Sequence, residues 1–323
     1  MKVFKSLTEV EKNQETVLTL GTFDGIHLGH KKIIEGVVEK ASQTGGRSFI
    51  ITFDPHPRTI VSKSGVKLLN TLSEKLEIIN GLGIENVLVI NFTKEFSQLE
   101  SETFIKNYIV DKVGLREIVI GYDHHFGKGR GGDERTLREL GVRYGFGVTK
   151  VDAVFVEGIS VSSTKIRNAL INGEVQLASS YLGNYYSFSG TVIRGDGRGR
   201  TLGFPTANIR LGDENKLLPA IGIYAVEVLI GHKKYYALLS IGRRPTFYID
   251  GNVTTEIYIL DFDSDIYGSE VTVNMIERIR GEEKFSTAEQ LIVQMQKDKE
   301  AGLEIFSKHS YKAGKLANGI FNN

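Results

Sequence analysis

The chain has 323 residues, enough for two domains, and 40 basic against 39 acidic side chains give a formal net charge of +1. This balance creates no field that would attract nucleic acid or an anionic membrane, so we expect neither as a partner. The absence of cysteine excludes disulfides, thiolate catalysis and cysteine-bound zinc. No run approaches the ~20 apolar residues of a membrane span and no apolar signal-peptide core opens the chain, so we expect a cytoplasmic protein.

The first half alternates apolar runs with helical patterns, which is typical of a doubly wound α/β domain with a parallel sheet. We expect strands at 17–20, 47–53, 86–91, 117–121 and 148–156, and helices at 28–42, 73–81, 100–112, 133–144 and 163–172. In such a sheet, ligands bind at the carboxyl ends of the strands, and polar motifs there are candidates for a site.

The turn GTFDGIHLGH, residues 21–30, connects the first expected strand to the first expected helix. Gly21 and Gly29 let the backbone turn tightly and approach a ligand, while His27 and His30 lie three residues apart where the helix begins. Free N–H groups and the helix dipole favour a phosphate there, and the histidines, if protonated, would stabilise a leaving pyrophosphate. The same residues also fit a tight turn with surface or core histidines.

Three further polar motifs follow expected strands of the same sheet, namely FDPHPR at 53–58, GYDHHFGKGRGG at 121–132 and VSSTKIR at 161–167. Because the carboxyl ends of parallel strands share one rim, the four motifs together favour a nucleotide site. A zinc site built from the histidines of this rim is the alternative, but no cysteine and no HExxH motif supports it.

Two of these motifs supply groups suited to a nucleotide. In VSSTKIR, Ser163 and Thr164 offer hydroxyl groups and Arg167 offers a positive charge to phosphates, although a capped helix with a basic solvated face fits the same residues. In GYDHHFG, Asp123 and Phe126 offer a polar group and an aromatic ring that can meet a flat ring system.

Beyond about residue 183 the helical periodicity gives way to β-rich segments separated by turns, which predicts a small antiparallel barrel or sandwich. We expect strands at 186–194, 221–230, 234–240, 254–262 and 270–279, followed by a helix from about 286 to 306. The residues after this helix show no convincing pattern.

The segment GTVIRGDGRGRTLGFPTAN, residues 190–208, is a Gly- and Arg-rich loop that can wrap nucleotide phosphates through backbone N–H groups. Thr206 and Asn208 lie two residues apart, so on an extended chain their oxygens share one face and can serve Mg²⁺ together with phosphates and waters. A barrel hairpin with a flexible loop is the alternative. In TTEIYILDF, residues 254–262, the alternation of a strand places the Glu256 side chain on the face opposite to its apolar neighbours. There it is either a base that takes the proton of an alcohol or a solvent-facing strand residue.

The ordered set of motifs resembles the bacterial bifunctional riboflavin kinase and FMN adenylyltransferase (FAD synthetase) family. GTFDGIHLGH, FDPHP, GYDHHFG and SSTKIR carry the resemblance in the first half, and GRGRTLGFPTAN, SIGRRPTF and TEIYILDFDSDIYG carry it in the second. It implies a Rossmann-like nucleotidyltransferase domain at 1–183 and a six-stranded antiparallel flavokinase β-barrel with a C-terminal helix at 184–307. The tail at 308–323 has no counterpart.

The resemblance implies phosphorylation of riboflavin to FMN by ATP, and then adenylyl transfer from ATP to FMN, giving FAD and pyrophosphate with Mg²⁺. By position, His27, His30 and Arg167 would act in adenylyl transfer and Glu256 would be the base of the kinase. Contacts with nucleotide or flavin are implied for Gly21, Phe23, Asp24, Gly29, Asp123, Phe126, Ser163, Thr164, Gly195, Gly197, Arg198, Gly199, Arg200, Thr206 and Asn208, the last two also holding Mg²⁺.

Two alternatives stay open from the sequence alone. One is an enzyme in which only one half works, and the other is a flavin-binding sensor that keeps the sites without turnover. The sequence does not decide between a monomer and a homo-oligomer.

Overall fold

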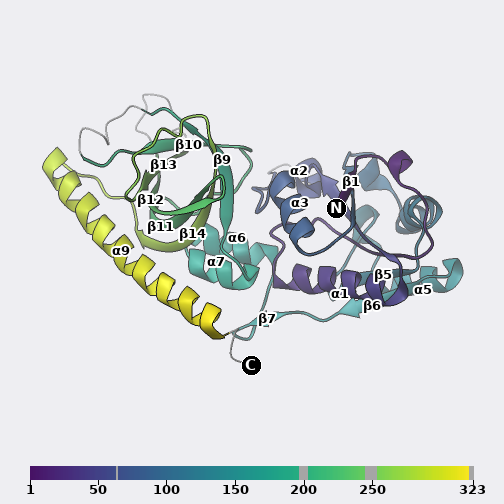
Figure 1. The fold of residues 1–323 in the computed structure, drawn as a ribbon. Helices are drawn as coiled ribbons and strands as arrows, with labels where there is room; N and C mark the ends of the chain where they lie inside the picture. The colour runs from purple at the N-terminus through teal and green to yellow at the C-terminus, as the bar shows by residue number, and fades with distance from the viewer. Residues whose placement is uncertain (63–64, 196–202, 244–252, 320–323) are drawn as a thin grey trace. The chain divides into compact units, whose positions relative to one another are not determined.

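The computed structural model describes residues 1–62, 65–195, 203–243 and 253–319, with side chains up to His309. The chain forms two compact units, Met1–Ser163 and Thr164–Asn323. Each unit has its own β-sheet, a parallel one in the first and a closed barrel in the second (Figure 1).

The sheet of the first unit has six strands in the order β1-β4-β3-β2-β5-β6, and every neighbouring pair is parallel. These strands are β1 (Lys2–Phe4), β2 (Thr16–Leu20), β3 (Arg47–Asp54), β4 (Asn86–Asn91), β5 (Glu117–Gly121) and β6 (Gly147–Val151). The predicted parallel α/β sheet is therefore confirmed. The strand expected at 148–156 is shorter, because the chain leaves the sheet after Val151 and forms a hairpin of β7 (Phe155–Val156) and β8 (Ile159–Ser160).

Helices connect these strands as predicted, with differences in detail. The longer ones are α1 (Leu28–Thr44), α2 (Pro57–Val61), α3 (Leu72–Gly81), α4 (Ser101–Phe104), the π-helix η3 (Ile105–Val113) and α5 (Glu134–Tyr144). Short 3-10 turns are η1 (Leu7–Glu9), η2 (Phe96–Gln98) and η4 (Lys128–Arg130). The helix expected at 100–112 thus consists of one α-turn followed by a π-helical segment.

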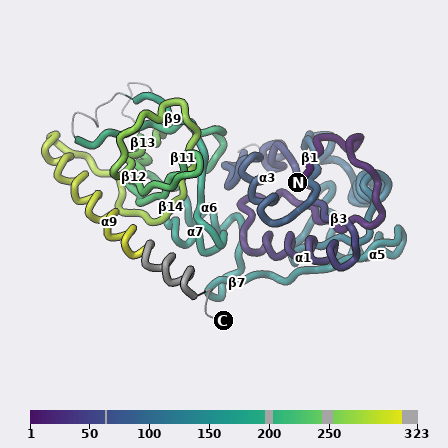
Figure 2. Tube along the Cα trace, in the orientation of Figure 1, coloured from purple at the N-terminus to yellow at the C-terminus, as the bar shows by residue number. Residues whose placement is uncertain are grey.

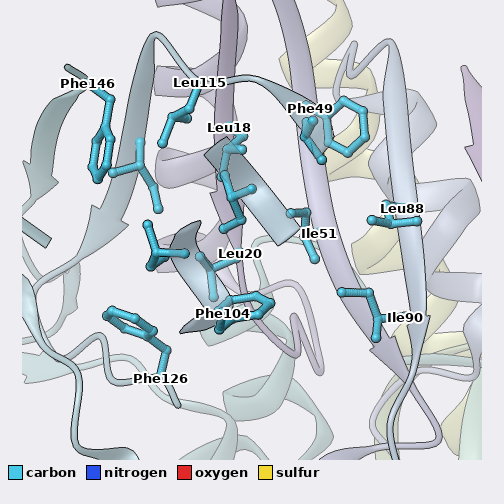
Figure 3. Packing of buried hydrophobic residues seen from close by; sticks show 14 of the residues in the cluster. Leu18, Leu20, Phe49, Ile51, Leu88, Ile90, Phe104, Leu115, Phe126 and Phe146 are labelled. Atoms are coloured by element: carbon cyan, nitrogen blue, oxygen red, sulfur yellow. The ribbon is translucent and has the colours of Figure 1, made fainter. Parts of the chain in front are cut away.

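Alternate residues of the strands pack on opposite faces of the sheet, because successive side chains of a strand point to opposite sides. Figure 3 shows one face, where Leu18, Leu20 and Ile51 pack with Phe104 and other aromatic rings. The other face carries a second cluster that includes Val17, Ile50, Val87 and Val119 together with apolar residues of α1 and α3. Burial on both faces explains why these strands read as continuous apolar runs.

The second unit is a closed antiparallel barrel with the strand order β10-β13-β12-β11-β14-β9. Its elements are α6 (Ser163–Asn172, whose first residue belongs to the first unit), α7 (Val175–Leu182), β9 (Ser187–Ile193), β10 (Ala207–Leu211), β11 (Gly222–Ile230), β12 (Lys233–Arg243), β13 (Val253–Ile259), β14 (Glu270–Arg280) and α9 (Ala288–Gly319). The predicted six-stranded barrel with a C-terminal helix is confirmed. The trace in Figure 2 shows the strands closing into a ring beside α9.

Helix α9 continues past residue 306, where the sequence pattern predicts its end. It packs on the outside of the barrel, where the ring of Phe306 stacks on Tyr236 with centroids 4.4 Å apart. A second attachment joins it to β14, since the Arg280 guanidinium donates to both carboxylate oxygens of Asp298 at 2.7 Å. None of the helices in the described part of the chain has the length and apolarity needed to cross a bilayer.

We expect Asp298→Ala to lower the free energy of unfolding of the barrel by about 3 kcal/mol, because it leaves the Arg280 charge buried without its partner. The exposed fractions of the two side chains are only 16% and 6%. The chain has no tryptophan, so calorimetry with hydrogen exchange of the α9 amides is the suitable measurement. Glu304→Ala is the control, because its ion pair with Lys308 is exposed and should contribute less than about 1 kcal/mol. Equal unfolding midpoints for the two variants would contradict the anchoring role.

Candidate functional sites

The turn between β2 and α1 has an unusual backbone. Phe23 and Ile26 adopt φ angles of 47° and 27°, in the left-handed region that non-glycine residues avoid, and Gly25 has φ 89°. Both side chains are almost fully buried, with 2% and 1% of their surface exposed, and this burial holds the conformation. Strained turns of this kind concentrate at binding and catalytic sites, so the turn is a candidate site on structural grounds.

His27 and His30 lie together at the first turn of α1. The Nδ1 atom of His27 caps the helix by accepting the His30 N–H at 3.3 Å, and the two rings stack with centroids 3.7 Å apart. A Cβ atom on Gly29 would lie 3.2 Å from the His27 ring, so glycine gives that ring its room. The structure therefore brings together the two histidines and the helix N–H groups that the sequence singled out.

Both histidines are neutral at physiological pH. Burial lowers the pKa of His27 to about 4, although the nearby charge of Asp123 opposes this shift. Burial lowers the pKa of His30 well below its ordinary value, and the charges of His27 and Lys75 lower it further. The prediction that protonated histidines stabilise a leaving pyrophosphate requires a bound anion to raise these lowered pKa values, and it stays a prediction. The neutral imidazoles can serve as hydrogen-bonding groups.

Asp24 and Ser163 fasten neighbouring loops to the turn. The buried Asp24 carboxylate accepts the N–H groups of Leu69 at 2.9 Å and Asn70 at 3.3 Å. The Ser163 hydroxyl donates to the Asp24 carbonyl at 2.8 Å, so this serine lies beside the turn. His56, which caps α2, has its Nε2 atom 3.8 Å from the Asp24 carboxylate, and burial lowers the pKa of His56 to about 4.

Lys75 is a buried residue of this region that the sequence reasoning missed. Only 5% of its surface is exposed, and its ammonium donates to the Thr52 hydroxyl at 3.4 Å. Burial lowers its pKa to about 8, against the opposing charge of Asp54. A signal existed in the sequence, because Lys75 lies three residues after Leu72 and four before Ile79, on the apolar side of α3.

The loop after β5 places its residues in two different environments. Asp123 is exposed, and its charge raises the pKa of His27, so its carboxylate lies near the histidine pair. Phe126, in contrast, is 6% exposed and belongs to the core of the first unit, with its ring 5.7 Å from that of His124. A role for Phe126 at a flavin stays a prediction.

Thr164 and Arg167 belong to the second unit, within α6. Burial lowers the pKa of the Arg167 guanidinium from its usual high value, but the nearby Tyr186 opposes the shift. Their predicted contact with phosphates stays a prediction.

The barrel brings Asn208, Glu256 and Thr206 together where β9, β10 and β13 meet. Asn208 pairs with Glu256 on one side and with Ile193 on the other. The Thr206 hydroxyl donates to the Glu256 carboxylate at 3.3 Å. A Cβ atom on Gly195 would lie 2.0 Å from the Asn208 amide nitrogen, so a larger residue there would displace the Asn208 side chain. The predicted residues Gly197, Arg198, Gly199 and Arg200 lie outside the described residues.

The oxygens of this cluster suit Mg²⁺. Asn208 and Thr206 offer neutral oxygens, and Glu256 adds a carboxylate beside them, a donor set that leaves room for phosphates and waters. Tyr258, two residues after Glu256 on the same strand, packs edge to face with Phe204 at 5.4 Å. The sequence reasoning did not predict this aromatic pair, and Tyr258 also packs against the apolar cluster that contains Phe306 of α9.

Comparisons with known proteins cover both units. The model of the FAD synthetase family matches residues 9–165, and the model of the riboflavin kinase family matches residues 182–306. A bifunctional riboflavin kinase/FMN adenylyltransferase of Listeria monocytogenes is 40% identical over 90% of this chain and 93% of its own length. The enzyme of the same name from Bacillus subtilis is 35% identical, with coverages of 92% and 94%.

A solved structure shares the fold along nearly the whole chain. The crystal structure of a macrolide-efflux protein from Streptococcus pneumoniae superposes with a TM-score of 0.85 at 31% identity. The match covers 93% of this chain and 98% of that one.

We expect the first unit to lose stability as the pH falls from about 6.5 toward 4. In the unfolded chain a histidine takes up a proton near pH 6.5, whereas burial lowers the pKa values of His27, His56 and His124 to about 4 in the folded chain. Between these values the unfolded state binds more protons and is favoured. Unfolding midpoints measured by calorimetry at pH 7 and pH 5 test this.

His56→Asn is the matched variant, because the asparagine oxygen can accept the Arg58 N–H that His56 Nδ1 accepts at 3.1 Å, but it does not titrate. Its midpoint should fall less between the two pH values. A wild-type midpoint that does not change from pH 7 to pH 5 would show that these histidines are not held neutral.

Proposed function

Because the chain belongs to the family of bifunctional riboflavin kinases and FMN adenylyltransferases, we propose that it makes FMN and FAD in two ATP-dependent steps. In the first step riboflavin is phosphorylated to FMN, and in the second AMP is transferred from another ATP to FMN, releasing pyrophosphate. The observation that carries the proposal is the presence of both family regions, each with an assembled group of polar residues.

For adenylyl transfer, the turn after β2 binds ATP. The first N–H groups of α1 and the neutral imidazoles of His27 and His30 donate to the phosphates. An oxygen of the FMN phosphate attacks the α-phosphorus, and the bond to pyrophosphate breaks with its electron pair leaving on pyrophosphate. No protein nucleophile is required. Ser163 supports the turn, and Thr164 and Arg167 assist at the phosphates.

The remaining residues of this site shape the turn or meet the flavin. Gly21, Gly29 and Phe23 set the backbone against which ATP lies, and Asp24 fixes the loop after it. Asp123 and Phe126 are assigned to the substrate loop. These assignments rest on motif position and on the geometry of the turn.

For riboflavin phosphorylation, Glu256 accepts the proton of the 5′-hydroxyl while that oxygen attacks the γ-phosphorus of ATP. Thr206 and Asn208 would hold Mg²⁺, which supplies charge neutralisation at the phosphates. The loop with Gly195, Gly197, Arg198, Gly199 and Arg200 covers the phosphates. Gly195, the described residue of this loop, lies beside Asn208, since a Cβ atom added to it would collide with the Asn208 amide nitrogen.

We assign adenylyl transfer to residues 1–183 and phosphorylation to residues 184–307, and we treat residues 308–323 as a C-terminal tail of unknown role. The absence of cysteine suits a reducing compartment, and we place the enzyme in the cytoplasm. Incubation with riboflavin, ATP and Mg²⁺ should yield FMN first and then FAD, and chelation of Mg²⁺ should stop both. A chain that forms only one of the two products, or binds flavin without consuming ATP, would contradict the bifunctional assignment.

We expect His27→Asn to lower FAD formation from supplied FMN by about 10²-fold or more, because a donor to the phosphates is lost. Asparagine still caps α1, so the helix start should be preserved. FMN formation from riboflavin should not change, and chromatography of both products gives the two rates. The control is His232→Asn, on the exposed turn between β11 and β12. Loss of FMN formation in the His27 variant would contradict separate sites.

We expect Glu256→Gln to slow FMN formation by about 10²- to 10⁴-fold. Glutamine can still accept a hydrogen bond from the Thr206 hydroxyl, but it cannot take the proton of the substrate. Adenylylation of supplied FMN should proceed at the wild-type rate. Glu270→Gln, an exposed change at the start of β14, is the matched control. If Glu256→Gln phosphorylates riboflavin normally, the base must be another group.

A further inference from the structure

Lys75 is a buried charged residue of the first unit that the mechanism above does not use. A lysine that is 95% removed from solvent costs folding free energy unless an anion or several hydrogen bonds compensate it. Among the described residues its ammonium makes one hydrogen bond, to the neutral hydroxyl of Thr52. Two of its three donor hydrogens are therefore not accounted for within that part of the chain.

The position of this ammonium is defined by a short chain of hydrogen bonds. Thr52 lies near the carboxyl end of β3, and its hydroxyl in turn donates to the Thr22 carbonyl at 3.3 Å. Thr22 belongs to the turn that precedes α1. Lys75 thus reaches from α3 to the carboxyl edge of the sheet, beside the turn that carries the histidine pair.

Lys75 is a positive group close to the histidines of this region. Its charge lowers the pKa values of both His30 and His56, so it lies within electrostatic reach of α1 and of the start of α2. Both imidazoles are neutral, and Arg58 is the further cation that acts on His56. Asp54, at the end of β3, is the anion that acts on Lys75.

We propose that the Lys75 ammonium binds a phosphate oxygen of ATP in the adenylyltransferase site and stabilises the charge that develops on the departing pyrophosphate. This inference rests on the proposed function. Lys75 remains protonated throughout, so the electron pair of the breaking bond stays on pyrophosphate and no proton is transferred. The polyanion supplies the compensation that the described protein groups do not supply, and the lysine supplies the charge that the neutral histidines lack.

Two variants test the proposal in the full-length protein. Lys75→Met, which keeps the bulk of the stem, should lower kcat/KM for ATP in FAD formation by about 10²-fold, and Lys75→Arg should restore most of it. FMN formation from riboflavin should be unchanged in both. The unfolding midpoint of Lys75→Met should rise, because a buried charge is removed, whereas loss of a structural lysine would lower it.

The dependence on pH gives a second readout. In the wild type, kcat/KM for ATP should fall as the pH rises through about 8, where the free ammonium loses its proton, and Lys75→Arg should lack this fall. Lys216→Met is the control for loss of a buried lysine, since Lys216 is 3% exposed in the second unit, over the Tyr186 ring. It should leave FAD formation unchanged.

Three outcomes would overturn the inference. The first is an unchanged kcat/KM for ATP in Lys75→Met. The second is a lower unfolding midpoint of Lys75→Met together with no recovery of kcat/KM in Lys75→Arg. The third is the same fall of kcat/KM at alkaline pH in the wild type and in Lys75→Arg. His27→Asn, measured in the same assay, separates a failure of the Lys75 role from a failure of the proposed function. If that variant loses FAD formation while Lys75→Met does not, only the role of Lys75 fails, and if neither loses it, the assigned site fails.

Discussion

Burial of nitrogen-bearing side chains at the carboxyl ends of β2 and β3 determines the charge of the first site. Three imidazoles there are held neutral, while the more basic Lys75 keeps its proton at neutral pH even though its pKa is lowered. The same desolvation makes any remaining interaction with a phosphate stronger than it would be in water. In the proposed site, the neutral imidazoles would orient the phosphates as hydrogen-bond donors, while Lys75 would add positive charge.

In the barrel, strand pairing rather than burial creates the site. Asn208 and Glu256 face each other because β10 and β13 pair in that register, and a slip of β10 by one residue would turn the Asn208 side chain to the other face. The Thr206 hydroxyl then orients the carboxylate from the residue just before the strand. In both units the backbone thus fixes the polar groups of the proposed site, through a helix terminus in the first unit and through strand pairing in the second.

The sequence predicted the parts of the fold that depend on continuous apolar runs or helical periodicity, such as β2 to β5 and the barrel strands β11 to β14. It missed β10 (Ala207–Leu211), because this short strand has only a brief apolar pattern and its extension is stabilised by pairing with β9 and β13. The position of His27 and His30 followed from the motif, but their charge did not, since desolvation depends on packing from distant segments. The burial of Lys75 was not predicted for the same reason, because a charged residue in a helix is usually exposed.

The left-handed conformations of Phe23 and Ile26 have a consequence for ligand binding. Their side chains are locked into the core, so the energy needed to hold this turn is supplied when the chain folds. If the turn binds a nucleotide as proposed, the ligand meets N–H groups that are already in place, and its binding energy is not spent on ordering a flexible loop. Packing of two apolar side chains in the core thus keeps the polar backbone groups of the turn in a single conformation.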